Sequence, residues 1–254
     1  MAHRMSHDIA RAARRRTRTM VATIAALVLG LAFVVVGLVV AFGHPGDDPV
    51  PGPAIIPVLP ETGPAASFPA QTAGPGAVSW STVAGAKVPV SAAMGPYDSR
   101  AGRARGFAHT PLGGVLAAAN ISVRLSPQVG PSVFEPTLDE QVVGPDADAL
   151  SQHLADDYQA DRAQLGLPYG ASAGRLYSTI TGYQVDMQGT DAATVRLLIE
   201  GPGQDGGSVL VSLATHVQWT GADWVLQAPN RGDWNSDAAV VTDAAGYTRF
   251  PDKA

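Results

Sequence analysis

His153, Asp157 and Asp161 are spaced four residues apart and form the clearest candidate metal site of this sequence. In a helix, side chains at this spacing lie on one face, where an imidazole and two carboxylates would stand together. These groups bind zinc and other divalent cations. Apolar residues also repeat every four positions in the same segment, and that pattern is typical of an amphipathic helix with a solvated polar face. We therefore expect neither a metal centre nor a cofactor.

Acid–base catalysis would need paired ionisable side chains enclosed by the fold. The candidates are Tyr177, Tyr183, Asp186 and His216. Asp186 alternates with the apolar residues of its segment, so its side chain should point away from them, and His216 stands alone in another alternating stretch. The sequence contains no H-E-x-x-H motif and no cysteine, which excludes a thiolate nucleophile. These patterns indicate no catalytic residue, and we expect a protein that is not an enzyme.

Three glycines at 201, 203 and 206 match the letters of the dinucleotide fingerprint G-x-G-x-x-G. A dinucleotide site needs a helix that begins at these glycines, because the helix N-terminus faces the pyrophosphate. The residues after position 206 alternate between apolar and polar instead, which predicts a strand. We expect a hairpin loop at this point of the chain.

Arg100, Arg103 and Arg105 form the only cluster of basic residues after position 42. Guanidinium groups bind the carboxylates of an acidic protein partner, which makes these three residues the candidate partner-binding site. The alternative interpretation is a solvated glycine-rich loop.

Hydrophobic periodicity predicts the elements that carry these residues. Residues 80–90 read as a strand, and Thr110 followed by Pro111 is a helix start, because Thr caps the first turn and Pro suits the first helical position. Asp146 is placed to cap the last of three helices. The predicted helices cover residues 111–122, 132–143 and 147–165, the last with Leu150, Leu154 and Tyr158 on its buried face.

After residue 174 the period changes from helical to alternating, which predicts antiparallel strands. A turn at residues 220–223 separates the last two, so Trp219 and Trp224 should lie on adjacent strands with Trp219 against the core. Three helices followed by such a meander define an α+β fold, with the helices on the apolar face of a curved sheet. The predicted strands cover residues 177–187, 195–199, 209–219 and 224–226.

Residues 20–42 form an uncharged apolar run of 23 residues. As a helix it would extend about 35 Å, enough to cross a bilayer core of ~30 Å. Six arginines precede it, and Asp47 and Asp48 are the first charges after it, so the tail 1–19 should be cytoplasmic and the rest of the chain outside the cell membrane. A signal peptide cleaved near Ala41 is the alternative, but the run is longer than the h-region of about 7–15 residues.

Residues 43–76 contain nine prolines and six glycines, a composition typical of an extended, semi-rigid linker. It would connect the membrane span to an exported domain, residues 77–254. The chain after residue 42 holds 11 basic and 21 acidic residues, a net charge of −10. Such an acidic domain lacks the basic surface that binds phosphates, so we expect no direct contact with nucleic acid.

The order of predicted elements, ending in the hairpin of Trp219 and Trp224, resembles the cone fold of the nuclear transport factor 2-like superfamily, whose members often close with a W-x-x-x-x-W hairpin. The segment 106–114, GFAHTPLGG, ahead of an alanine-rich helix, is similar to actinobacterial membrane proteins encoded with conjugative elements. The resemblance spans roughly residues 80–229. It implies a TcpC-like, bitopic subunit of a type IV secretion system, although TcpC-like proteins can carry two cone domains and this chain has length for one.

These inferences predict a non-enzymatic, single-pass membrane scaffold of a conjugative DNA-transfer or type IV secretion-like machine. Its exported domain would contact other subunits of that complex, or a second copy of itself. The alternative is a cone-fold binding module or enzyme acting on a small or cell-wall ligand outside the membrane. A pocket with paired ionisable residues would favour the alternative, whereas a filled apolar interior with an exposed patch favours the scaffold.

Overall fold

The computed structural model of the 254-residue chain describes residues 78–203 and 206–251. The predicted tail 1–19, membrane span 20–42 and linker 43–76 lie outside the described residues. Within the described ranges, no helix has both the length and the apolar character that crossing a bilayer requires. These residues form an α+β domain with three α-helices, as the sequence pattern predicted, and with two sheets where it predicted one.

The described domain contains three α-helices, α3 (Pro111–Arg124), α4 (Pro131–Gln141) and α5 (Ala147–Leu165). The first begins where predicted, because Thr110 Oγ1 accepts a hydrogen bond from the Gly113 N–H at 3.1 Å. The third ends where predicted, at Gly166, which takes the left-handed conformation with φ 65°. Asp146 occupies the N-cap position of α5, but its side chain forms no capping bond.

Residues 80–90 were predicted as one strand, and this was wrong: they belong to a hairpin of β1 (Ser79–Val83) and β2 (Ala86–Val90). The chain reverses at Ala84 and Gly85, which have φ 46° and 85°. Two successive residues with positive φ make the tight turn that matches the twist of paired strands. Alanine is a poor marker of such a turn, so the sequence did not reveal it.

The main sheet has the strand order β3-β7-β6-β5-β4-β9, and β8 also pairs with β6. Only the β3–β7 pair is parallel among these described strands. One edge of β6 pairs with β5, and its other edge is divided between β7 and β8. The strands are β3 (Val142–Val143), β4 (Thr179–Gln188), β5 (Ala192–Pro202), β6 (Ser208–Trp219), β7 (Trp224–Gln227), β8 (Ala238–Val241) and β9 (Thr248–Arg249).

The second predicted helix is two residues too long at its C-terminal end, because β3 takes up the last two residues of the range 132–143. The connections between elements include short 3₁₀ helices at Pro127–Val129, Asn230–Gly232 and Trp234–Asp237.

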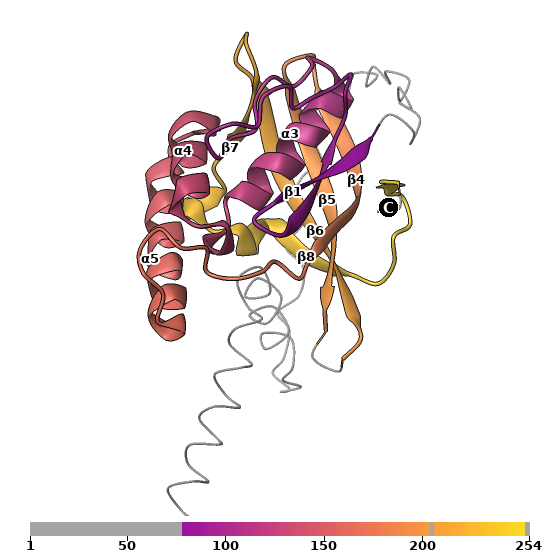
Figure 1. The fold of residues 1–254 in the computed structure, drawn as a ribbon. Helices are drawn as coiled ribbons and strands as arrows, with labels where there is room; N and C mark the ends of the chain where they lie inside the picture. The colour runs from indigo at the N-terminus through magenta and orange to yellow at the C-terminus, as the bar shows by residue number, and fades with distance from the viewer. Residues whose placement is uncertain (1–77, 204–205, 252–254) are drawn as a thin grey trace, which may run out of the picture.

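The hydrophobic core lies between α3 and the sheet. Figure 1 shows α3 crossing in front of the strands, and it contacts β4, β5, β6 and β7. Val115, Leu116 and Ile121 on α3, and Val195 and Leu197 on β5, have no solvent exposure. Each such side chain contributes about 1.5–3 kcal/mol by leaving water. The helix α4 packs on α3, β3 and β7. The predicted face of α5, Leu150, Leu154 and Tyr158, is buried, and Tyr158 contacts Phe134 of α4.

Trp219 and Trp224 pair directly across the β6–β7 hairpin, as predicted. The central residue of the two is Trp224, which is fully buried, while Trp219 is partly buried and packs at the edge of the core. The Trp224 indole N–H donates to the carbonyl oxygen of Ala108 at 2.9 Å. A Cβ on Gly113 would lie 1.9 Å from that same oxygen. Only glycine therefore lets the loop before α3 approach the helix this closely.

In β4, the side chains that the sequence predicts to face the core do so only after a bulge in the strand. The register between β4 and β5 shifts between Ile180 and Gly182, and such an extra residue moves the following side chains to the other face. Tyr183 and the alternate residues after it pack against the core, as predicted. Tyr177, which precedes the strand, is 63% exposed instead.

Both ends of the described domain meet at β1. The Trp80 ring contacts Phe250 edge-on, with centroids 5.9 Å apart, and the Trp80 indole N–H donates to the Pro251 carbonyl oxygen at 3.1 Å. Phe250 also contacts Tyr183, at a centroid distance of 5.0 Å. The C-terminal residues therefore join the first hairpin to the main sheet.

Candidate functional site

The three predicted arginines lie on one short hairpin, residues 98–107, which we call the arginine loop. The main-chain N–H groups of Asp98 and Arg105 each donate to the other residue's carbonyl oxygen, at 3.0 and 2.7 Å. The chain reverses at Ala101 and Gly102, where φ is 53° and 79°. These main-chain bonds define the shape of the loop before any side chain is considered.

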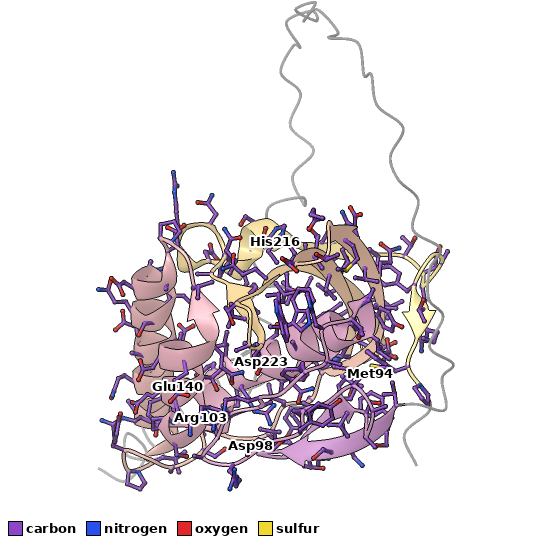
Figure 2. The ribbon with its side chains drawn as sticks, turned by 90° about the horizontal axis from the view of Figure 1, so that it is seen from above. Met94, Asp98, Arg103, Glu140, His216 and Asp223 are labelled. Atoms are coloured by element: carbon purple, nitrogen blue, oxygen red, sulfur yellow. The ribbon has the colours of Figure 1, made fainter. Side chains whose placement is uncertain are left out.

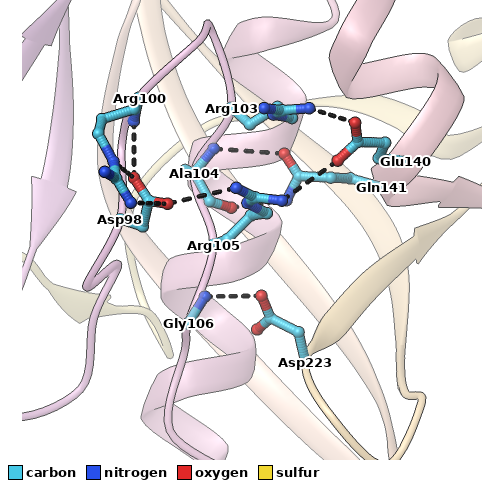
Figure 3. A network of polar contacts seen from close by, with 9 residues as sticks. All are labelled: Asp98, Arg100, Arg103, Ala104, Arg105, Gly106, Glu140, Gln141 and Asp223. Carbon is cyan, nitrogen blue, oxygen red and sulfur yellow. Dashed lines mark hydrogen bonds and ion pairs between the residues drawn. The ribbon is translucent and has the colours of Figure 1, made fainter.

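Five side chains on and beside the loop form a chain of ion pairs with alternating charge (Figure 3). Arg100 donates to Asp98 through Nε, at 2.9 Å from Oδ1, and through Nη2, at 3.1 Å from Oδ2. Asp98 Oδ2 also accepts from Arg105 Nη2 at 3.3 Å. Arg105 Nη1 lies 3.3 Å from Glu140 Oε2, and the other oxygen of Glu140 pairs with Arg103. Three positive charges thus face two negative charges.

The exposure of the three arginines falls along this network. The side chain of Arg100 is 88% exposed, that of Arg105 42% and that of Arg103 18%. Hydrogen bonds from Arg100 hold the pKa of Asp98 well below its usual range, and the same bonds raise the pKa of Arg100. The Arg103 Nε is buried and has no hydrogen-bond partner among the described residues. Arg103 therefore serves as an internal clamp, while Arg100 faces solvent.

Uncharged contacts fix the loop to α4. Gln141 Nε2 donates to the Ala104 carbonyl oxygen at 2.6 Å, and its Oε1 accepts the Ala104 N–H at 3.3 Å. At the tip, a Cβ on Gly102 would lie 2.4 Å from the carbonyl oxygen of Ser132, at the start of the helix. The loop therefore rests directly on the helix backbone, where only glycine fits.

Arg124, at the end of α3, is a buried cation beneath the loop. It is 3% exposed; its Nε donates to the Gly102 carbonyl oxygen, and its Nη1 donates to both the main-chain and the side-chain oxygen of Asn120, each at 3.0 Å. Burial lowers its pKa to about 10, which leaves it charged at neutral pH. Within the described ranges it has no ion-pair partner. Arg124 thus adds a further positive charge beside the loop.

Asp223, in the β6–β7 turn, holds the end of the loop. Its Oδ2 accepts the Gly106 N–H at 2.7 Å, and its Oδ1 accepts the N–H groups of Phe107 and Trp224, both at 2.9 Å. One carboxylate therefore satisfies three main-chain donors from two distant segments. This arrangement links the arginine loop to the hairpin that closes the sheet.

The structure brings the three predicted arginines together, and it adds five residues that sequence reasoning missed: Asp98, Arg124, Glu140, Gln141 and Asp223. The first is two positions from Arg100, and this short separation was an available signal. The others lie 22 to 117 residues away from their partners. No local sequence pattern predicts contacts between residues so far apart in the chain.

His153, Asp157 and Asp161 lie along α5, where the first and the last form hydrogen bonds with different neighbouring segments. His153 Nδ1 lies 3.0 Å from the Gly232 carbonyl oxygen, and Asp161 accepts from Gln128 Nε2 at 3.3 Å. Burial raises the pKa of Asp157 and of Asp161. In the part of the chain that the structure describes, no group of three or more His, Asp or Glu residues is arranged to hold a metal ion.

Asp186 and His216 lie on one row across the sheet, on either side of Thr194. His216 Nδ1 is 3.1 Å from the Thr194 hydroxyl oxygen. The row alternates with Val195, which is buried in the core, so it lies on the face away from α3. Figure 2 shows His216 on the opposite side of the domain from Asp98. The sheet thus places Asp186 and His216, which the sequence had offered as catalytic candidates, on one row, but this row lies outside the core.

The glycine pattern at residues 201–206 falls in the hairpin between β5 and β6, as predicted. Residues 204 and 205 lie outside the described ranges. The Gly203 N–H donates to the Gly207 carbonyl oxygen at 2.8 Å, which closes the loop. The next element is the strand β6, so no helix N-terminus is present to receive a pyrophosphate.

Residues 170–174, GASAG, match the letters G-x-S-x-G, which makes Ser172 a candidate nucleophile. Sequence reasoning missed this match. A nucleophile elbow needs a strand before the serine and a helix after it. Ser172 instead follows α5 and precedes β4, and its hydroxyl donates to the carbonyl oxygen of Gln128. The serine thus ties a surface loop to the neighbouring 3₁₀ turn.

The fold and the loop define a class: an α+β domain in which helices pack on one side of a mostly antiparallel sheet and clamp an arginine-bearing hairpin. A family model described as a domain of unknown function (DUF8175) matches residues 50–249, and the chain belongs to this family. The match includes the arginine loop and begins inside the proline-rich segment 43–76. No curated protein and no solved structure matches the chain.

Proposed function

We propose that this protein is a single-pass membrane scaffold of an actinobacterial conjugative DNA-transfer or type IV secretion-like machine. Its tail lies in the cytoplasm, residues 20–42 cross the membrane, and a TcpC-like domain of the cone fold lies outside. The domain acts by contact with other protein subunits, and the arginine loop is its contact site.

The order of elements supports the cone-fold part of the proposal. Two helices precede the short strand β3, the helix α5 follows it, and the four antiparallel strands β4–β7 come next, before the short strands β8 and β9. The helix α3 packs on the inner face of this sheet (Figure 1). The closing hairpin carries the paired residues Trp219 and Trp224, on which the resemblance to cone folds rests.

The filled interior is the observation that carries the scaffold proposal. Leu116 on α3 and Leu197 on β5 both have no exposure, and most of the buried side chains around them are apolar, with Asn120 and Thr215 as polar exceptions that carry no charge. An enzyme or ligand-binding cone would present ionisable groups in this space. Asp186 and His216 are instead exposed on the outer face. The charged groups that are held in a defined arrangement gather on the arginine loop, which is a surface feature suited to protein contact.

The sequence outside the described residues supports the anchor. Six arginines precede the apolar run 20–42, and the family match begins only at residue 50. The anchor would hold the exported domain near its partners, which raises its effective concentration without adding any contact.

The proposal is tested by DNA transfer from a donor whose own copy of the gene is deleted. Transfer should fall to background on deletion and return with the full chain. A second version of the gene encodes a cleavable secretion signal in place of residues 1–42, so that the same domain is exported without its anchor. This released domain should not restore transfer, although its exported protein level matches that of the full chain.

Two results would overturn the proposal: transfer that does not depend on the gene, or full rescue by the released domain. A variant with both Asp186→Asn and His216→Gln distinguishes the scaffold from the alternative, an enzyme that uses these two residues. Transfer should stay within about twofold of the parent, since neither side chain lies in the proposed contact. Loss of transfer at normal membrane level would favour catalysis on the outer sheet face.

A further inference from the structure

We propose that Arg100 binds one carboxylate of an acidic segment on a partner protein, and that the rest of the arginine loop holds Arg100 in position for this contact. The inference rests on the proposed scaffold function and names the chemistry of its partner. It also gives the three arginines different roles, because Arg100 is the most exposed of them and contacts one carboxylate, whereas Arg105 lies between two carboxylates and Arg103 is mostly covered.

The order of positive and negative side chains along the network shows where a carboxylate of a partner would fit. Along the chain of contacts the order is Arg100, Asp98, Arg105, Glu140, Arg103, so the network begins and ends with a positive charge. The Arg103 end is 18% exposed and is closed by α4, whereas the Arg100 end is 88% exposed. One added carboxylate at the exposed end would complete the alternation. Ion-pair networks are the case in which surface charges contribute measurably.

Arg100 is oriented before any partner arrives. Asp98 accepts from its Nε and Nη2, and the Arg100 main-chain N–H also donates to Asp98 Oδ1 at 3.0 Å. A guanidinium has five N–H donors, so these two bonds leave three for another acceptor on this exposed side chain. A fixed fork loses less conformational entropy on binding a carboxylate than a free arginine does.

The surroundings favour an acidic protein over a nucleic acid. Four of the 11 basic residues after position 42 belong to this site: Arg100, Arg103, Arg105 and Arg124. The same part of the chain has a net charge of −10. A phosphate backbone would be repelled along most of the surface, because it needs many basic contacts together. A short acidic segment needs one, and repulsion elsewhere would direct it to this loop.

The chain has no cysteine, so Ser99→Cys creates a single labelling site beside Arg100. Ser99 is exposed, and Ser236→Cys, also exposed, is the matched control on another surface. A benzophenone maleimide is attached from outside to cells that express the full chain, and the cells are then illuminated. We expect a covalent adduct from position 99 and none at comparable yield from position 236. Mass spectrometry of the adduct should identify a partner segment rich in Asp or Glu.

The charge test uses the labelled Ser99→Cys chain. Arg100→Glu should lower the adduct yield by about tenfold, and Arg100→Gln should lower it less, because it removes the charge without reversing it. Arg196→Glu makes the same charge change at an exposed arginine on β5 and should leave the yield within about twofold. Changing the crosslinked acidic residue of the partner to Arg should restore the adduct with Arg100→Glu. A melting curve of each purified variant checks that the domain is folded.

The inference is overturned by an adduct that Arg100→Glu leaves unchanged, by a crosslinked segment without acidic residues, or by adducts formed only with a second copy of this chain. Failure here is distinct from failure of the scaffold proposal. Transfer that requires the anchored chain but tolerates Arg100→Glu would reject only this contact. Transfer that ignores deletion of the gene would reject the scaffold role itself.

Discussion

His109 and Trp219 stack face to face, with ring centroids 4.3 Å apart and an interplanar angle of 8°. The Nε2 atom of His109 lies 2.9 Å from Asp191 Oδ1 and 3.0 Å from the Thr190 carbonyl oxygen. Both neighbours are acceptors, so Nε2 carries the proton. Trp224 contacts both rings edge-on, each at 5.7 Å. The cluster thus leads from the surface at His109 to the centre of the core.

Trp224→Ala and Trp219→Ala should therefore have unequal effects on stability. Removal of the fully buried Trp224 should lower the free energy of unfolding by about 3–5 kcal/mol, because it leaves a cavity. Removal of Trp219, which is partly buried, should cost roughly 1–2 kcal/mol. Urea unfolding of the purified domain measures both. Equal losses, or a larger loss for Trp219→Ala, would contradict the assignment of Trp224 as the central residue.

Gly113→Ala and Gly114→Ala form a matched pair at the start of α3. At position 113 the new methyl group would lie 1.9 Å from the Ala108 carbonyl oxygen, so the loop or the helix must move, and we expect a loss of at least about 2 kcal/mol. At position 114 the nearest atom is a Trp224 ring carbon at 3.5 Å, an ordinary contact. There Ala should be neutral or gain up to about 1 kcal/mol, because Gly is the poorer helix former. Thermal melting of both variants checks the contrast.

Asp223→Ala removes the acceptor of three main-chain N–H groups. We expect a loss of about 1–3 kcal/mol, since partly buried donors are left without partners. The exchange of the Gly106 and Phe107 amide hydrogens should also accelerate, which hydrogen-exchange mass spectrometry detects. The control is Asp233→Ala, whose carboxylate accepts one main-chain N–H, from Asn235 at 2.9 Å. A loss no larger than that of the control would show that Asp223 does not hold the loop.

Asp157→Asn should stabilise the domain at neutral pH. Burial, the larger cause, and the charge of Asp156 raise the pKa of Asp157, so its charged form is disfavoured in the folded state. For a carboxyl with a raised folded pKa, this penalty is present above the folded pKa and fades as the pH falls through it. The side chain still meets solvent, so we expect a gain of only about 0.5 kcal/mol at pH 7. At pH 7 the melting temperature of the variant should be higher than that of the parent, and at about pH 3 the two should be equal.

The control for this charge effect is Asp148→Asn. Asp148 lies in the first turn of α5, where a negative charge favours the helix N-terminus. Its removal should cost about 0.3–1 kcal/mol at pH 7, opposite in sign to the change at position 157. If Asp157→Asn and Asp148→Asn change the stability in the same direction, burial of Asp157 is not the cause of the change at position 157.

The predicted topology can be measured with reporters on the full chain. A phosphatase fused after Ala254 should be active, because it folds only outside the cytoplasm, and the same reporter fused after Arg18 should be inactive. The first fusion should remain with the membrane after a high-salt wash. Activity of the Arg18 fusion would reverse the assignment, and release of the Ala254 fusion by cleavage would favour the signal-peptide alternative.

Local signals predicted the helices of this domain well. The Thr110 cap and Gly166 stop each depend on a few neighbouring residues, so periodicity and residue type were sufficient to find them. The paired tryptophans were also predicted, since a short turn fixes the register of a hairpin. The errors occurred where the local signal was ambiguous: a turn at Ala84, and a bulge before Tyr183 that reversed the facing of the residues before it.

The arginine loop was predicted as a cluster but not as a network. Arg100, Arg103 and Arg105 are visible as neighbours in the sequence, whereas Glu140 reaches them only because α4 packs against the loop. Asp223 comes from the far end of the chain. Which arginine faces solvent is decided by these distant contacts, and a sequence pattern alone assigns all three the same role.

If the proposed anchor holds the chain at the membrane, a mechanical load would reach the described domain at β1, whose Trp80 side chain donates to the Pro251 carbonyl oxygen. A pull from residue 78 reaches β1, and behind it the two-stranded hairpin, before it reaches the seven-stranded sheet. The next point of resistance is Asn120, whose side chain donates to the Pro89 carbonyl oxygen at 2.8 Å and holds β2 to α3. Under the proposed function, tension between the anchor and a partner would therefore act first on the two-stranded hairpin, and the arginine loop lies on the other side of the Asn120 contact in the chain.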